Sequence, residues 1–173
     1  QKLLKNEVRV RFGVNVVKTG QFSELIEAAL LSYRNGTIEA AQVIEELIAI
    51  AKKMQNSEVE TAALGLSEDE ALFYDALIVN GSAKEVMNDD QLRDLARVLV
   101  QQVRNDATID WQVRERVQAK LKVNVKKTLQ KYGYPPDQQA LATSLVLEQA
   151  KAYGDTWSKK ESYQAGGGAS LID

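Results

Sequence analysis

Apolar residues recur at every third or fourth position through most of this chain, and this periodicity constrains the fold more than any other feature. In the clearest example, Phe22, Ile26, Ala29 and Tyr33 follow the spacing of a helix with one buried face. Asn35-Gly36 supplies a stop signal immediately afterwards. The expected helices occupy about 22–35, 37–54, 68–80, 89–103, 108–131 and 136–153.

Helix-capping residues precede most of these segments. Ser67 followed by Glu70 is a capping box, in which each side chain accepts a hydrogen bond from the other residue's backbone. Ser82 with Glu85 offers a second box for a short helical turn. The other expected caps are Thr37, Thr108 and either Asn88 or Asp89.

The N-terminal segment is the one place where a strand pattern appears, because Val8, Val10, Phe12, Val14 and Val16 alternate. No partner strand is visible, and a lone strand would leave its backbone groups unpaired. We therefore expect a helix from about Lys2 to Arg11 followed by an extended segment. The predicted fold is all-α, a single compact bundle-like domain of about six or seven helices over 1–155, with a flexible glycine-rich tail over 156–173.

Composition narrows the functions that such a domain can perform. The chain has 173 residues, 45% of them hydrophobic, which is enough for one domain with a core. It contains no cysteine and no histidine, which excludes disulfides, thiolate nucleophiles and the Ser-His-Asp arrangement within this chain. No apolar run approaches the roughly 20 residues that span a bilayer. We expect a cytoplasmic protein that makes no membrane contact.

The formal net charge of −2 conceals an uneven distribution. Fourteen acids and four bases lie between Glu24 and Asp90, a net −10. Eight bases and three acids lie between Arg104 and Lys131, a net +5, and the first 23 residues carry a net +4. Such asymmetry suggests a charged partner, although helices of soluble proteins also carry biased solvent faces.

The most basic stretch lies on the predicted helix 108–131. At 100° per residue, Val117, Leu121, Val125 and Leu129 fall on one side of this helix and the basic residues on the other. This side could contact nucleic-acid phosphates, dock an acidic protein surface, or simply remain solvated. The candidate binding residues are Arg116, Lys120, Lys122, Lys126, Lys127 and Lys131.

The motif YGYPPD follows the basic helix directly. Pro135 and Pro136 fix φ and exclude Tyr134 from helical geometry, so the motif should set the angle between two helices. We expect Tyr132 and Tyr134 to pack over the turn at Gly133 rather than to bind a ligand. The turn is therefore predicted to be structural.

Three strings at their observed spacings, LFYDAL, TIDW and YGYPPD, resemble the C-terminal helical region of the restriction (motor) subunit of type I restriction–modification enzymes. The resemblance covers about Lys2 to Ala152. It implies a fragment of an ATP- and Mg-dependent DNA translocase fused to a nuclease. The motifs of those two activities are not found in this chain, so no cofactor, metal site or catalytic residue is expected in it.

The resemblance implies an assembly role for such a fragment. We expect an interaction module that docks the motor on the core of methylation and specificity subunits, with contact to the DNA backbone as a second activity. The alternative is a domain that mainly binds DNA. A helical enzyme that uses carboxylates alone is a third class, for which the sequence offers no positive feature.

Overall fold

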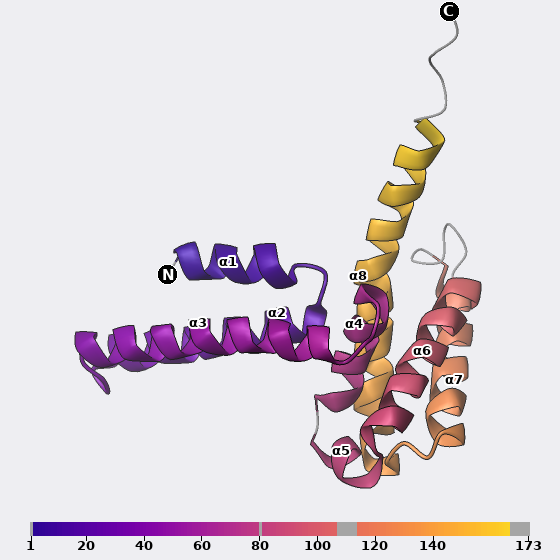
Figure 1. The fold of residues 1–173 in the computed structure, drawn as a ribbon, viewed down its shortest axis with the longest axis horizontal. Coiled ribbons are helices and arrows are strands. Elements are labelled where there is room, and N and C mark those ends of the chain that lie inside the picture. Colours follow the sequence, from indigo (N-terminus) through magenta and orange to yellow (C-terminus); the bar gives the residue numbers. More distant parts are fainter. Residues whose placement is uncertain (1, 80, 107–113, 167–173) are drawn as a thin grey trace, which may run out of the picture.

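The computed structural model describes residues 2–79, 81–106 and 114–166, and their side-chain environments as far as Gly154. Every regular element in these ranges is helical, which confirms the all-α prediction (Figure 1). Eight α-helices and one 3₁₀ helix occur in them, against the six or seven helices expected. They are α1 (Lys2–Phe12), α2 (Val16–Arg34), α3 (Ala40–Ala63), α4 (Glu68–Ile78), α5 (Ser82–Val86), α6 (Asp89–Asp106), α7 (Glu115–Lys131), η1 (Pro136–Gln138) and α8 (Gln139–Gly166).

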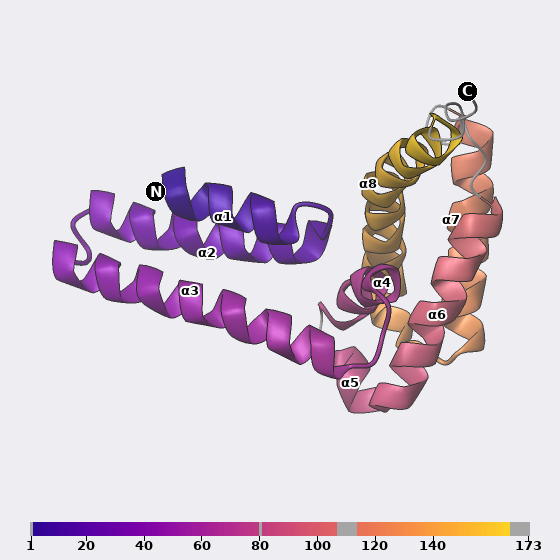
Figure 2. The same ribbon diagram turned by 45° about the horizontal axis from the view of Figure 1, so that its top comes forward.

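The helices form two packed groups. Helices α1 to α3, which we call the arm, project sideways from helices α4 to α8, which we call the bundle (Figures 1 and 2). Each group has a hydrophobic cluster of its own. Val17, at the start of α2, is the one buried arm residue that belongs to the bundle cluster.

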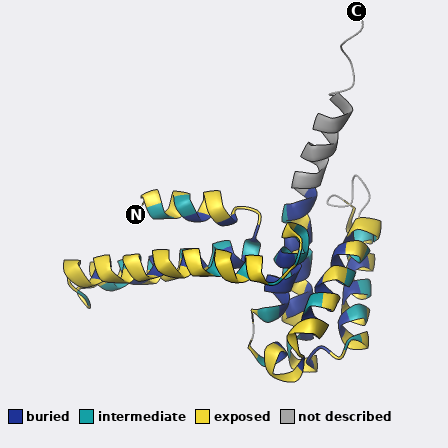
Figure 3. Cartoon of the chain, in the orientation of Figure 1, coloured by how far each residue is buried: buried dark blue, intermediate teal, exposed yellow. Residues whose placement is uncertain are grey.

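The bundle consists mainly of four helices around one core. Helix α4 packs on α6 and α8, and α7 packs on the same two helices, so α4 and α7 occupy opposite corners. Leu95, Leu99, Leu121 and Val146 are fully buried between them. The apolar face that the sequence assigns to each of these helices is therefore the face that is buried (Figure 3).

The arm is a helical hairpin of α2 and α3 with α1 laid along it. Phe12 of α1 stacks on Phe22 of α2, with ring centroids 5.1 Å apart. Ile26 and Met54 belong to the same hydrophobic cluster and are almost fully buried. Much of the arm surface remains exposed (Figure 3).

Two of the predicted caps form as expected. In the Ser67–Glu70 box, the Ser67 N–H donates to Glu70 Oε2 at 3.0 Å and the Glu70 N–H donates to Ser67 Oγ at 3.3 Å. Asn88 caps α6 in the same reciprocal way with Gln91. These capping bonds join residues three positions apart, so they form independently of the tertiary contacts of the helix.

The other cap predictions need correction. Ser82 makes no capping bond at the start of α5, and its Oγ is buried without a hydrogen-bond partner. Helix α3 is capped at Glu39, whose N–H donates to the side chain of Gln42, and not at Thr37. The predicted cap Thr108 lies outside the described residues, and α7 is described from Glu115.

Helix ends also differ from the sequence pattern. The expected extended segment shrinks to 13–15, because Asn15 caps α2 through its Oδ1, which accepts the Lys18 N–H at 3.0 Å. Helix α3 continues past Met54 to Ala63 and stops before Gly65, whose φ is +68°. Helix α8 continues past Tyr153 to Gly166, so part of the expected tail is helical backbone, and 167–173 lie outside the described residues.

Candidate interaction surface on helix α7

Helix α7 is anchored by one face only. Leu121, Val125 and Leu129 are fully buried against α6 and α8. Two polar side chains beside them bind α6: Asn124 Nδ2 donates to Asp106 Oδ2 at 2.8 Å, and Thr128 Oγ1 bonds Gln102 Oε1 at 2.9 Å. These contacts fix the rotation of α7 about its own axis, and with it the direction in which its outer side points.

The outer side of α7 carries all six candidate residues, and each is exposed. At 100° per residue they form two rows on either side of Val123, which is itself 51% exposed. Lys122 and Lys126 form the row nearer α8, and the other four lie on the α6 side. We call this surface the basic face: Arg116, Lys120, Lys122, Lys126, Lys127 and Lys131.

The basic face is not neutralised by its surroundings. Among the described residues, no ion pair includes any of its six members. The arginines of the neighbouring helix α6 behave differently. Arg97 contacts Asp94 at 2.8 Å and Glu70 at 3.8 Å, and Arg104 pairs with Asp69.

These α6 pairs neutralise part of the acidic start of α4. Helix α4 begins with three consecutive acids, and it lies at the corner of the bundle opposite α7. The acidic start of α4 is therefore separated from the basic face, with the paired arginines of α6 between them. The basic N-terminal segment instead pairs with acids of the 24–90 segment, as in Lys5–Glu27 and Arg11–Glu58.

The YGYPPD motif closes α7 with a tight turn. Gly133 has φ +73°, its N–H donates to the Gln130 carbonyl at 3.1 Å, and the Tyr134 N–H donates to the Leu129 carbonyl at 2.9 Å. This is a Schellman motif, which requires a left-handed residue at the glycine position. Pro136 then opens η1, which leads directly into α8.

Tyr134 and Pro135 are buried in this turn, whereas Tyr132 is half-buried and Pro136 is exposed. The Tyr134 hydroxyl donates to the Leu77 carbonyl of α4 at 2.6 Å, and its own carbonyl accepts from Gln139 Nε2 at 3.0 Å. Burial raises the pKa of Tyr134 to about 12, with a smaller contribution from the charge of Asp137. The side chain thus stays neutral and serves as a tie between α4 and the α7–α8 connection.

A polar cluster that the sequence analysis did not single out joins the arm to the bundle. We call it the junction: Asn15, Lys18, Asp75 and Gln149, all of them buried. Lys18 Nζ lies 3.5 Å from Asp75 Oδ2 and donates to the Ser57 carbonyl at 3.2 Å and to Thr61 Oγ1. Four isolated polar residues carry no shared sequence signal, except that Asn15 before a helix is a recognisable cap.

Further hydrogen bonds complete the junction. Asn15 Nδ2 donates to Asp75 Oδ2 at 2.7 Å. Gln149 of α8 accepts from the Val16 N–H at 3.0 Å and donates to the Val14 carbonyl at 2.7 Å. Burial raises the pKa of Asp75, an effect that Lys18 and Asn15 oppose. The turn between α1 and α2 is therefore held on both α4 and α8.

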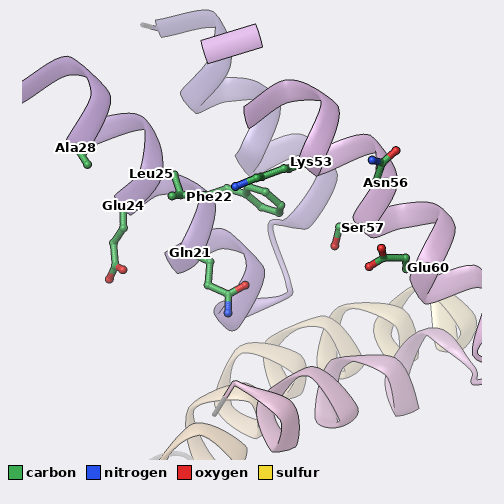
Figure 4. A pocket seen from close by; sticks show the side chains of 9 residues that line it. All are labelled: Gln21, Phe22, Glu24, Leu25, Ala28, Lys53, Asn56, Ser57 and Glu60. Carbon is green, nitrogen blue, oxygen red and sulfur yellow. The ribbon is translucent and has the colours of Figure 1, made fainter. Parts of the chain in front are cut away.

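Several cavities lie beside the arm, and two of them have volumes of about 600 Å³ or more. A groove of about 650 Å³ runs between α2 and α3, where Phe22, Leu25, Lys53 and Glu60 are among its lining residues (Figure 4). A second cavity of about 600 Å³, which we call the elbow cleft, lies where the arm meets the bundle. Its lining includes Val10, Val14, Ala62 and Leu72.

The described part of the chain holds no group of three or more acidic side chains arranged to bind a metal ion. Nor does any helix there combine the length and the apolarity that crossing a membrane requires.

Comparison with known proteins places the chain. Residues 1–155 match the family described as "Type I restriction enzyme HindI endonuclease subunit-like, C-terminal". The chain belongs to this family. It is 35% identical over 151 residues to the type I restriction enzyme HindI endonuclease subunit of Haemophilus influenzae. It is 30% identical over 138 residues to a putative type I restriction enzyme MjaIXP endonuclease subunit of Methanocaldococcus jannaschii. No solved structure matches it.

These alignments cover most of this chain and little of the relatives. The HindI subunit match includes 87% of this chain and 14% of that protein, and the MjaIXP match includes 76% and 13%. The chain thus corresponds to about one seventh of an endonuclease subunit, at the C-terminal end by the family's description. The family expected from the sequence is confirmed.

Proposed function

We propose that this chain is a non-catalytic assembly domain of a type I restriction endonuclease subunit, which docks that subunit on the methyltransferase and specificity core. The observation that carries this proposal is the basic face, two rows of exposed cations on a helix, none of them in an ion pair among the described residues. An acidic surface of a partner subunit would complement it, and the paired α6 arginines keep the acids of α4 from opposing that contact.

The form of the basic face also favours a protein partner. Val123 lies exposed between its two rows of cations. An apolar centre with a charged rim is typical of protein interfaces, whereas aromatic side chains that would stack on single-stranded bases are absent from α7. The arm adds exposed apolar side chains such as Leu31 and Ile44, which a protein partner would bury.

Contact with the DNA backbone is the second activity that we propose for the same face. From Arg116 to Lys131 the helix rises about 22 Å at 1.5 Å per residue, long enough to follow several phosphates. Such contacts carry no sequence information, so this binding would be non-specific. If DNA is the principal partner, the chain is chiefly a DNA-binding domain.

The deciding experiment compares Lys122→Gln/Lys126→Gln with a matched control, Lys2→Gln/Arg9→Gln, which removes two exposed charges from α1. Binding of each variant to a 30-base-pair duplex and to the methyltransferase and specificity core is measured over a salt series. For docking, the α7 variant associates more slowly with the core and keeps its DNA affinity. For backbone contact, the slope of log affinity against log salt falls by roughly one unit per lost phosphate contact.

The control variant should match the unchanged chain in both assays. If the α7 variant also matches it in both assays, the basic face is a solvated surface and the proposal is wrong.

A further inference from the structure

Helix α3 carries an apolar stripe that no part of the described chain covers. Ile44 and Ile48 are 57% and 51% exposed, although another face of α3, which includes Val43 and Ile50, is buried mainly against α2. Ala41 and Ala51 extend the stripe and are also exposed. We call these four residues the α3 ridge; their 3-4-3 spacing places them within about 80° of arc, the pattern of a coiled-coil seam.

Charged side chains border this ridge along one edge. Glu45 and Lys52 lie within about 40° of it, are exposed, and take part in no ion pair among the described residues. They are seven residues apart, so they lie on one line along the helix, about 10 Å from each other. This edge of the α3 ridge therefore carries a negative charge towards the N-terminal end of the helix and a positive charge towards its C-terminal end.

We propose that the α3 ridge binds the α3 ridge of a second copy of this chain, with the two helices antiparallel. In that arrangement Glu45 of each copy lies opposite Lys52 of the other, and both pairs form at once about a two-fold axis near Ile48. A parallel pair would place the charged edges of the two helices on opposite sides of the seam, where no Glu45–Lys52 pair forms. The charges thus select both the second copy and its direction.

The other side of α3 does not offer such a seam. Glu46 and Lys53 have the same seven-residue spacing but lie about 100° further round the helix. Lys53 lines the groove between α2 and α3, whose apolar lining residues Phe22, Leu25 and Ala28 come from α2 (Figure 4). On α3 its neighbours in this lining are the polar residues Asn56, Ser57 and Glu60. Glu46 and Lys53 therefore have the charge spacing of Glu45 and Lys52 but do not border an exposed apolar stripe on α3.

The antiparallel register also gives the elbow cleft an occupant. With Glu45 opposite Lys52, Ala40 at the start of α3 in one copy is level with Ser57 of the other, and the turn before Ala40 extends from there towards Ala62. Ala62 lines the elbow cleft, and the turn at 35–39 is the free end of the projecting arm (Figure 2). The end of each arm consequently reaches the mouth of the other copy's cleft. This contact lies on the arm, so it does not depend on the role proposed for the basic face.

Sedimentation equilibrium of the 173-residue chain at low salt tests the pairing. We expect a monomer–dimer equilibrium with a dissociation constant of about 10 to 500 µM, because the ridge is smaller than a standard interface. Ile48→Asp should remain monomeric at all these concentrations. Glu45→Lys and Lys52→Glu should each weaken dimerisation roughly ten- to thirtyfold, because both symmetric pairs become repulsive.

Mixing two variants gives a more specific test of the pairing. In a one-to-one mixture of Glu45→Lys with Lys52→Glu, every lysine again faces a glutamate, so heterodimers should form with about the affinity of the unchanged chain. The double variant Glu45→Lys/Lys52→Glu should also dimerise normally. Glu46→Lys and Lys53→Glu, the matched controls, should leave the equilibrium unchanged, and circular dichroism checks that every variant is folded.

A chain that stays monomeric throughout this range would overturn the proposal. So would a dimer that survives Ile48→Asp, a mixture that fails to restore pairing, or control variants that weaken the dimer as much as Glu45→Lys does.

Discussion

The arm and the bundle are both helical and adjacent in sequence, yet they bury their apolar side chains to different extents. Among the described residues, twenty buried side chains form the bundle cluster and eight form the arm cluster. Eight of the thirteen exposed large apolar side chains lie on the arm, including Leu3, Val10, Leu31 and Val59. A group of three helices has fewer inward-facing positions than a closed four-helix bundle, so more apolar surface stays outside.

The two regions also differ in how they are joined to their surroundings. The bundle is held by apolar packing, whereas the arm meets it through the polar junction and Val17. Polar contacts are directional, so they fix the angle of the arm more tightly than apolar contacts of the same area would. We expect the bundle to supply stability and the arm to present binding surface.

The largest expected changes in stability come from truncating a buried side chain in each of the two hydrophobic clusters. Leu99→Ala in the bundle should lower the free energy of unfolding by about 3 kcal/mol, because a fully buried leucine is lost. Ile26→Ala in the arm should cost about 2 kcal/mol by the same mechanism, but hydrogen exchange should accelerate in α1 to α3 alone. If exchange accelerates equally in α6 to α8, the arm and the bundle unfold as one unit.

The next effect concerns the connection between the regions. Asp75→Leu leaves the buried Lys18 ammonium without its carboxylate partner and the Asn15 amide without its acceptor, and should cost about 3 kcal/mol. Spin-label distances between α3 and α7 should broaden as the arm loses its fixed direction. Lys18→Met/Asp75→Leu should cost less than Asp75→Leu alone, because no uncompensated charge then remains. Unchanged distances would show that packing at Val17 is sufficient.

The junction should also give the protein a pH dependence. Burial raises the pKa of Asp75 in the folded state, so the folded chain binds this proton more tightly than the unfolded chain does. Its contribution to stability is complete below the unfolded value of about 4 and is lost as the pH rises through the raised folded value. Urea denaturation at a series of pH values should show this decline, and Asp75→Asn should lack it.

A smaller effect on stability is expected from glycine-to-alanine substitutions in two turns, one in the arm and one in the bundle. Gly36 lies in the turn between α2 and α3 with φ +69°, and Gly133 follows the end of α7 with φ +73°, each with open space where a Cβ would stand. Alanine at either position should therefore cost about 1 kcal/mol through backbone strain alone. Gly133→Ala should lower the melting temperature of the whole chain, and Gly36→Ala should affect exchange near the arm tip. Equal changes in melting temperature would argue against separate regions.

The smallest expected effect on stability belongs to the basic face. Lys122→Gln/Lys126→Gln should change the free energy of unfolding by less than about 0.5 kcal/mol, because both side chains are exposed and make no ion pair. Chemical denaturation measures this directly. A loss above about 1 kcal/mol would mean that these lysines stabilise α7 itself, which would weaken the case for binding.

Local signals in the sequence predicted the parts of the fold that depend on neighbouring residues. The Ser67–Glu70 cap, the apolar face of α7 and the glycine-proline turn after it all follow from spacing within one segment. The end of α3 did not, because the polar run after Met54 appears loop-like in isolation. It remains helical, and Ser57 and Thr61 in this run meet the ammonium group of Lys18 from another helix.

For the candidate site too, some features follow from the sequence and others depend on the tertiary structure. Periodicity alone placed the six cations of the basic face on one side of a helix, since that depends only on the 3.6-residue repeat. The separation of this face from the acids of α4 depends on which helices become neighbours, and pairing of Asp69 with Arg104 is a contact across 35 residues. Likewise, spacing makes the α3 ridge apolar, but only the packing of α2 on a different face of α3 leaves it exposed. Sequence determined what each helix carries, because side-chain direction is set by the local backbone; tertiary structure decided which of those faces remain available, because burial depends on the whole chain.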